Sequence, residues 1–85
     1  MKYYIGKIRE CNDGMEYTDK YLFATNKKPE RYTDRVAMEW RGGDRDDWDK
    51  EQKAYWSDCT LIFDEGSTEI PKEDFDVLRK YLPVL

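Results

Sequence analysis

Five carboxylates fall within eight residues of one segment, and hard oxygen ligands at this density raise the question of a calcium site. They are Asp44, Asp46, Asp47, Asp49 and Glu51 in the stretch RGGDRDDWDKEQ, residues 41–52. In a calcium-binding loop that starts at Asp44, Trp48 takes a ligand position and Tyr55 stands where the final glutamate belongs. A loop that starts at Asp47 has Gln52 in place of its essential glycine. The sequence therefore predicts no metal site here and no cofactor elsewhere.

General acid–base catalysis is the second chemistry that carboxylates can perform. The remaining acidic candidates lie in the last third of the chain: Asp64, Glu65, Glu69, Glu73 and Asp74. No nucleophile or cationic clamp accompanies them, and the chain has no histidine, which removes the commonest general base and zinc ligand. We therefore expect no enzyme, and a carboxylate-dependent hydrolase is the less favoured alternative.

The two cysteines are far apart in the sequence, at positions 11 and 59. A secreted domain of this size usually carries several disulfides, so we expect two reduced thiols and a cytoplasmic protein. Cys59 lies among apolar strand residues and is expected to be an inert core thiol, whereas Cys11 should be more exposed near a turn.

Trp48 is surrounded by charged residues, which is unusual for a core residue. The segment predicts a short helix, capped by Asp44 or Asp46, with acidic residues leading and lysines trailing at spacings of four. On such a helix Trp48 either folds back onto the edge of the core or stands in solvent as an anchor for another protein. The sequence leaves both interpretations open.

Charge is unevenly distributed along the chain. The net charge is −4, from 15 Lys and Arg against 19 Asp and Glu. Residues 1–41 carry nine basic and seven acidic side chains, whereas residues 42–85 carry six and twelve. An acidic surface repels phosphate backbones and anionic membranes, so we expect no direct nucleic-acid or membrane binding. The natural electrostatic partner is a basic protein surface, unless the charge only keeps the domain soluble.

The elements that must position these residues form one domain, residues 1–85. Residues 1–11 and 15–25 read as two strands joined by the turn Asn-Asp-Gly at 12–14. Met15, Tyr17, Tyr21 and Phe23 alternate along the second strand and should face the core, which leaves the opposite face mostly polar.

The rest of the chain reads as helix, short helix, strand, strand and helix. Residues 26–43 predict a helix with the apolar stripe Tyr32, Val36 and Trp40, ended by two glycines. A strand through Phe63, a turn at 64–67, a short strand at 68–70 and a helix at 71–83 follow. The order ββα(short helix)ββα predicts an α+β domain with about four antiparallel strands and its helices packed on one face.

Small, acidic, aromatic-rich chains of this kind resemble the proteins by which phages and mobile elements block host nucleic-acid enzymes, including anti-CRISPR and anti-restriction proteins. The resemblance implies a non-enzymatic inhibitor that docks on a basic, nucleic-acid-binding protein, and the same features suit an immunity protein, an antitoxin or an assembly subunit. The predicted partner-binding residues are Asp44, Asp46, Asp47, Trp48, Asp49, Glu51, Asp64 and Glu65.

Overall fold

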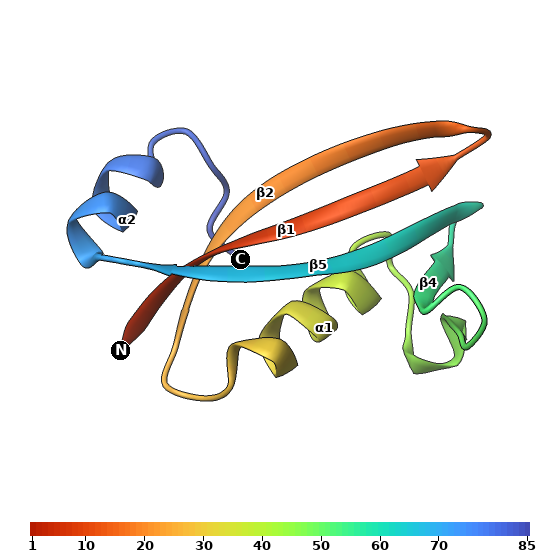
Figure 1. Ribbon diagram of the computed structural model, residues 1–85, viewed down its shortest axis with the longest axis horizontal. Coiled ribbons are helices and arrows are strands. Elements are labelled where there is room, and N and C mark those ends of the chain that lie inside the picture. The colour runs from red at the N-terminus through yellow and green to blue at the C-terminus, as the bar shows by residue number, and fades with distance from the viewer.

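The computed structural model describes residues 1–85 as a five-stranded antiparallel sheet with one helix on each face (Figure 1). The strand order is β2-β1-β5-β4-β3. This confirms the α+β class, with five strands in place of about four. The elements are β1 (Lys2–Asn12), β2 (Met15–Thr25), α1 (Pro29–Glu39), a 3₁₀ turn (Arg45–Asp47), β3 (Trp48–Asp49), β4 (Ala54–Ser57), β5 (Thr60–Ile70) and α2 (Lys72–Leu78).

The first hairpin forms as the sequence predicts. Asn12 pairs with Met15, and the two turn residues between them, Asp13 and Gly14, have φ of 50° and 78°. Positive φ at both central positions matches the turn to the right-handed twist of the flanking strands.

The expected strand through Phe63 is wrong, because the chain reverses at Asp58 and Cys59. Their φ values are 52° and 56°, and Ser57 pairs with Thr60 across them, so that β4 and β5 form a second tight hairpin. Cys59 lies in this turn and is exposed, so it is not the core thiol that the sequence suggested.

The expected turn at residues 64–67 is also wrong, because β5 runs through it. Gly6 pairs with Ser67 and Ile8 with Asp64, so two residues of β5, Glu65 and Gly66, lie opposite one residue of β1. Gly66 supplies the positive φ of 82° that this bulge requires, and its N–H donates to the Asp64 carboxylate at 2.9 Å. The glycine bends the strand without ending it.

Helix α1 covers one face of the sheet and encloses the main core. Tyr4 stacks on Phe23, and Phe23 stacks on Tyr32 of α1, with ring centroids 4.9 and 4.5 Å apart. The most buried helix residues are Thr33 and Ala37, whereas the predicted stripe of Tyr32, Val36 and Trp40 is only partly buried along one side. The buried hydrophobic cluster is Tyr4, Ile8, Tyr21, Phe23, Ala37, Tyr55 and Ile62.

Helix α2 lies on the opposite face, so the prediction that both helices share one face is wrong. Phe75 of α2 packs against Tyr3, 4.8 Å between centroids, and neighbouring residues Tyr3 and Tyr4 point to opposite sides of β1. The chain end then runs beside β2, where Leu22 N–H donates to Pro83 and Leu22 C=O accepts from Leu85. This cover buries Leu22 on the face that was expected to be polar.

The tip of the first hairpin extends beyond both helices. Tyr21 and Phe23 are buried as predicted, but Met15 and Tyr17 are exposed because nothing covers β2 before Tyr21. No helix of the structure is both long enough and apolar enough to cross a bilayer.

Candidate partner-binding surface

The acidic segment forms one 3₁₀ turn followed by a two-residue strand, not the short helix that the sequence predicted. The Asp44 carboxylate caps the turn by accepting a hydrogen bond from the Asp46 N–H at 2.9 Å, and the Asp47 carboxylate accepts one from the Asp44 N–H at 2.8 Å. This is a capping box, so Asp44 and Asp47 hold the local backbone. Helix formation stops at Trp48 because its backbone extends to pair with β4.

Trp48 lies at the outer edge of the sheet, where it pairs with Tyr55. The indole meets the Tyr55 ring edge-on, with centroids 4.9 Å apart at 64°, and 42% of the residue remains exposed. Part of the side chain therefore packs at the margin of the core, and the rest is exposed. That Trp48 anchors another protein stays a prediction.

Trp56 is a second exposed indole that the sequence analysis missed. It is 52% exposed, whereas the preceding residue, Tyr55, is buried. Successive strand residues point to opposite faces, so adjacent aromatic residues in a strand place one ring outward wherever the outer face is open. That pattern, in the sequence AYWS, is the signal that could have identified it.

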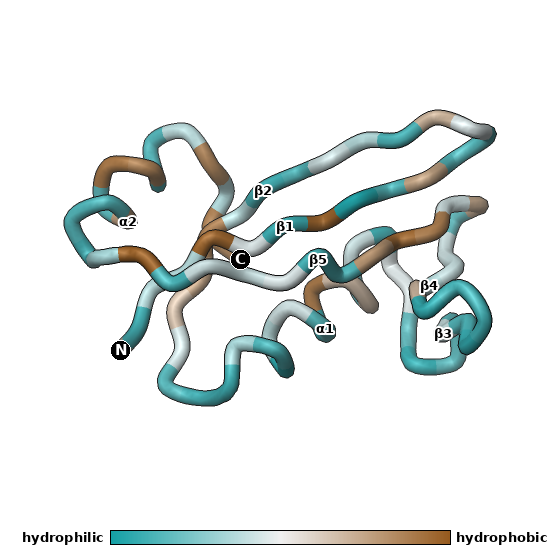
Figure 2. Tube along the Cα trace, viewed as in Figure 1, coloured by the Kyte–Doolittle hydropathy of each residue, from teal (hydrophilic) through white to brown (hydrophobic).

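Trp48 and Trp56 are both among the residues that line one shallow hollow of about 620 Å³ at the β3–β4 end of the sheet. Figure 2 shows hydrophilic colour over much of this end of the chain. We call the residues lining the hollow the tryptophan surface: Asp46, Asp47, Trp48, Asp49, Lys50, Glu51 and Trp56. Four acidic residues and one lysine thus line the hollow together with two partly exposed tryptophans.

The carboxylates of the tryptophan surface differ in how they are engaged. Asp49 accepts the N–H groups of Glu51 and Gln52 at 2.9 and 3.1 Å and so shapes the turn. The side chains of Asp46 and Glu51 make no hydrogen bond or ion pair within the chain and are exposed. These two are the charges that a partner can reach without disturbing the fold.

A polar contact behind Trp48 connects this end of the sheet to α1. The Tyr55 hydroxyl donates to Asp34 at 2.6 Å, and Arg45 donates to the other oxygen of Asp34 at 3.0 Å and to the Tyr55 hydroxyl at 2.7 Å. Burial, and then the hydrogen bond to Asp34, raise the pKa of Tyr55 to about 12. Because Trp48 rests on Tyr55, this contact helps to fix the indole.

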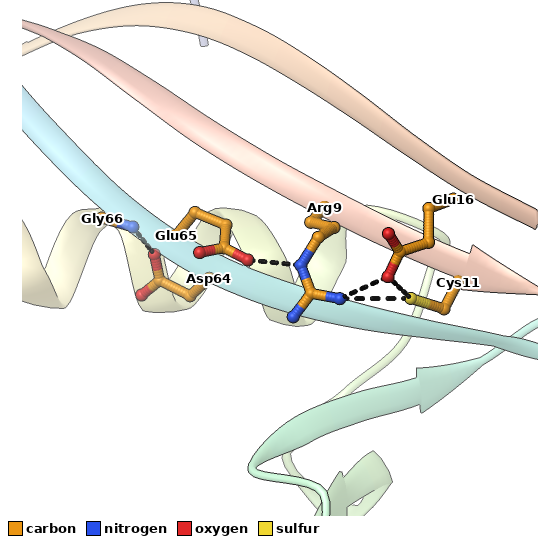
Figure 3. Close-up of polar contacts among 6 residues, drawn as sticks. All are labelled: Arg9, Cys11, Glu16, Asp64, Glu65 and Gly66. Carbon is orange, nitrogen blue, oxygen red and sulfur yellow. Dashed lines mark hydrogen bonds and ion pairs between the residues drawn. The ribbon is translucent and has the colours of Figure 1, made fainter.

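Asp64 and Glu65 lie outside the tryptophan surface and have partners within the chain. Asp64 accepts a hydrogen bond from the Thr33 hydroxyl of α1 at 3.0 Å. Glu65 accepts one from Arg9 Nε at 2.6 Å (Figure 3). Arg9 also reaches Glu16 at 2.9 Å, which joins β5, β1 and β2 across the sheet face that α1 does not cover. The structure thus separates these two acids from the six predicted residues of the 44–51 segment.

The Cys11 thiol belongs to this cross-strand cluster. It lies 3.3 Å from both Arg9 Nη1 and a Glu16 oxygen, and burial together with Glu16 raises the pKa of the thiol. A thiol with a raised pKa is a poor nucleophile at neutral pH. We therefore assign no catalytic role to it.

No group of three or more histidine, cysteine or acidic side chains is arranged to hold a metal ion. Comparisons with protein-family models, with curated proteins and with solved structures gave no match to this chain.

Proposed function

We propose that this chain is a non-enzymatic protein-binding module that docks through the tryptophan surface onto a basic surface of another protein. The observation that carries the proposal is that two tryptophans, 42% and 52% exposed, line one hollow together with four acidic residues. Large exposed aromatic side chains in a polar rim are typical of binding hot spots.

The charge around the indoles determines the kind of partner. Carboxylates at Asp46 and Glu51 steer a basic surface toward the hollow, and the indoles then supply the buried contact area. Enzymes that bind nucleic acids have basic surfaces of this kind, because the backbone of their substrate carries a regular series of negatively charged phosphates. Occupying such a surface blocks the substrate, which is the action of a phage or mobile-element inhibitor of the anti-CRISPR or anti-restriction kind, working in the cytoplasm.

Affinity capture from a host lysate, read by mass spectrometry, tests this function. The immobilised wild-type chain is compared with Trp56→Ala and with the double variant Asp46→Lys/Glu51→Lys. The matched control is Glu69→Lys/Glu73→Lys, which makes the same charge change at two exposed positions outside the tryptophan surface.

We expect the wild type and the control to capture the same basic protein, and both surface variants to lose at least about tenfold of it. Recovery of a nuclease or another nucleic-acid enzyme favours inhibition, and recovery of a toxin favours an immunity protein or an antitoxin. Capture that is equal for all four proteins would refute docking through this surface.

A further inference from the structure

A hollow of about 400 Å³ lies where the loop that joins β2 to α1 meets the first turns of α1 (Figure 1). Its lining contains four cationic side chains and no carboxylate. This composition is unexpected in a chain whose acidic residues outnumber its basic residues by 19 to 15. We call it the basic hollow, and its lining residues are Met1, Ala24, Thr25, Asn26, Lys27, Lys28, Arg31, Tyr32 and Arg35.

The chain itself does not neutralise these cations. Lys27, Lys28 and Arg31 are exposed and make no ion pair. Arg35 has only one long contact, 3.9 Å from its Nε to Glu39. Its guanidinium lies over the Tyr32 ring, 4.8 Å from the centroid, and this contact keeps the charge beside the basic hollow. The positive charge therefore remains available to a ligand.

The cations also lie where the helix tolerates them least. Lys28 is the N-cap of α1, and Arg31 lies close behind it, at the end where the helix dipole is already positive. Arg31 and Arg35 are four residues apart on the helix, a spacing that destabilises like charges. Glu30 is the only acid of the first turn, and it pairs with none of them. A placement that opposes local stability is typical of a functional site, and a bound anion would offset both repulsions.

Two neutral side chains of the basic hollow can donate hydrogen bonds to an anion. The Asn26 amide has no partner within the chain, and the Thr25 hydroxyl accepts the Lys27 N–H at 3.1 Å, which leaves its own proton free. Phosphate oxygens accept several hydrogen bonds at once from cationic and neutral donors.

We propose that the basic hollow binds a compact polyphosphate, an anion with two or three linked phosphate groups. Four cations match the several negative charges of linked phosphates, whereas a single carboxylate would leave most of them unpaired. A long nucleic-acid strand fits less well. The acidic residues of the rest of the chain would repel its other phosphates.

A second hollow, of about 470 Å³, adjoins the basic hollow and shares Tyr32 and Arg35 with it. Four of its six lining residues are hydrophobic, so it offers a place for an organic group attached to the phosphates. Inorganic triphosphate and a nucleoside triphosphate therefore carry the same chemistry for the basic hollow, and only the second would also use its neighbour.

Isothermal titration calorimetry of the full chain with sodium triphosphate, at about 50 mM salt, tests the proposal. We expect one ligand per chain, with a dissociation constant of about 100 µM or below that rises as salt is added. ATP forms the second arm. Tighter binding of ATP than of triphosphate would place the nucleoside in the neighbouring hollow, and equal binding would assign the affinity to the phosphates alone.

The double variant Lys28→Gln/Arg31→Gln removes two cations of the basic hollow and should weaken triphosphate binding about tenfold or more. The matched control is Arg79→Gln/Lys80→Gln, which also removes one arginine and one lysine, both exposed and just after α2. It should bind as the wild type does. Without ligand, the hollow variant should melt no lower than the wild type, because the substitutions relieve repulsion at the start of α1. Triphosphate should raise the Tm of the wild type and of the control much more than that of the hollow variant.

Four results would overturn the proposal. They are no binding of triphosphate up to about 1 mM, equal binding by the hollow variant, an equal response to sodium sulfate, and tighter binding of a short single-stranded oligonucleotide than of triphosphate. The basic hollow shares no residue with the tryptophan surface, so the outcome is independent of the proposed function.

Discussion

Replacing Tyr21 by phenylalanine is expected to stabilise the protein. Tyr21 is fully buried, and its hydroxyl oxygen is the one buried side-chain polar atom without a hydrogen-bond partner. The ring lies directly against Gly6 of β1, where an added Cβ would meet it at 2.2 Å. The wild-type chain therefore bears the desolvation cost of this group.

The magnitude follows from two opposing terms. An unsatisfied buried hydroxyl costs roughly 1–3 kcal/mol, which Tyr21→Phe removes. The missing oxygen leaves a void of about 10 Å³, which at roughly 24 cal/mol per Å³ costs only about 0.2 kcal/mol. The net gain is about 1–3 kcal/mol in the free energy of unfolding. For a chain of this size that corresponds to a rise in Tm of roughly 5–15 °C.

Urea denaturation measures this change directly. The midpoint should rise while the slope m stays constant, because the surface exposed on unfolding is nearly unchanged. Tyr81→Phe is the control, since Tyr81 is 78% exposed and its hydroxyl is solvated, and it should shift the midpoint very little. A Tyr21→Phe protein that is no more stable than the wild type would show that the hydroxyl is satisfied, and would refute the reasoning.

Three further predictions concern packing, pH and the docking surface. Gly6→Ala should destabilise the fold by roughly 1–3 kcal/mol or more in urea denaturation, because the new methyl group overlaps the buried Tyr21 ring. The melting temperature should fall steeply as the pH rises above about 10, where tyrosine ionises in the unfolded chain, toward and through 12. The reason is that burial raises the folded-state pKa of Tyr21 and, with the Asp34 hydrogen bond, raises that of Tyr55 to about 12, so the unfolded state loses its protons first. Trp48→Ala should lower stability by roughly 1–3 kcal/mol, less than loss of a fully buried tryptophan would, and should also weaken docking by about 2 kcal/mol. Trp56→Ala should weaken docking with little loss of stability. Calorimetric melting measures the effect on stability, and titration with the captured partner measures the effect on docking.

Local sequence predicted the elements whose signals are complete within a few residues. The turn Asn12–Gly14 contains the residue types that positive φ requires. Pro29 indicates the first turn of α1, and Phe75 indicates the buried side of α2. The turn at Asp58 and Cys59 was not predictable in this way. It places two non-glycine residues at positive φ, and tertiary pairing of β4 with β5 imposes this conformation against local preference.

Glycine at position 66 shows why a correct local signal can still mislead. A turn and a bulge both need positive φ, and only the pairing of β5 with the distant strand β1 determines which one forms.

The prediction of the docking surface was incomplete for the same reason, because the sequence carries no direct information on long-range pairing. Trp48 stood out by its charged neighbours, but its place beside Trp56 depends on how β3 pairs with β4.

The central position of β5 affects how the chain folds during synthesis. β5 lies between β1 and β4 in the sheet, yet it is the last strand to leave the ribosome. At 5–20 residues per second, the 45 residues that follow β2 up to Ile70 take about 2–9 s to be made. Throughout that interval β1 has an open inner edge and an exposed apolar face, and its eventual partner residues are fifty or more positions away in the sequence. The first hairpin is therefore the part of the nascent chain most exposed to aggregation and to chaperone binding, and a messenger that stops before codon 60 produces a chain that cannot close its own sheet.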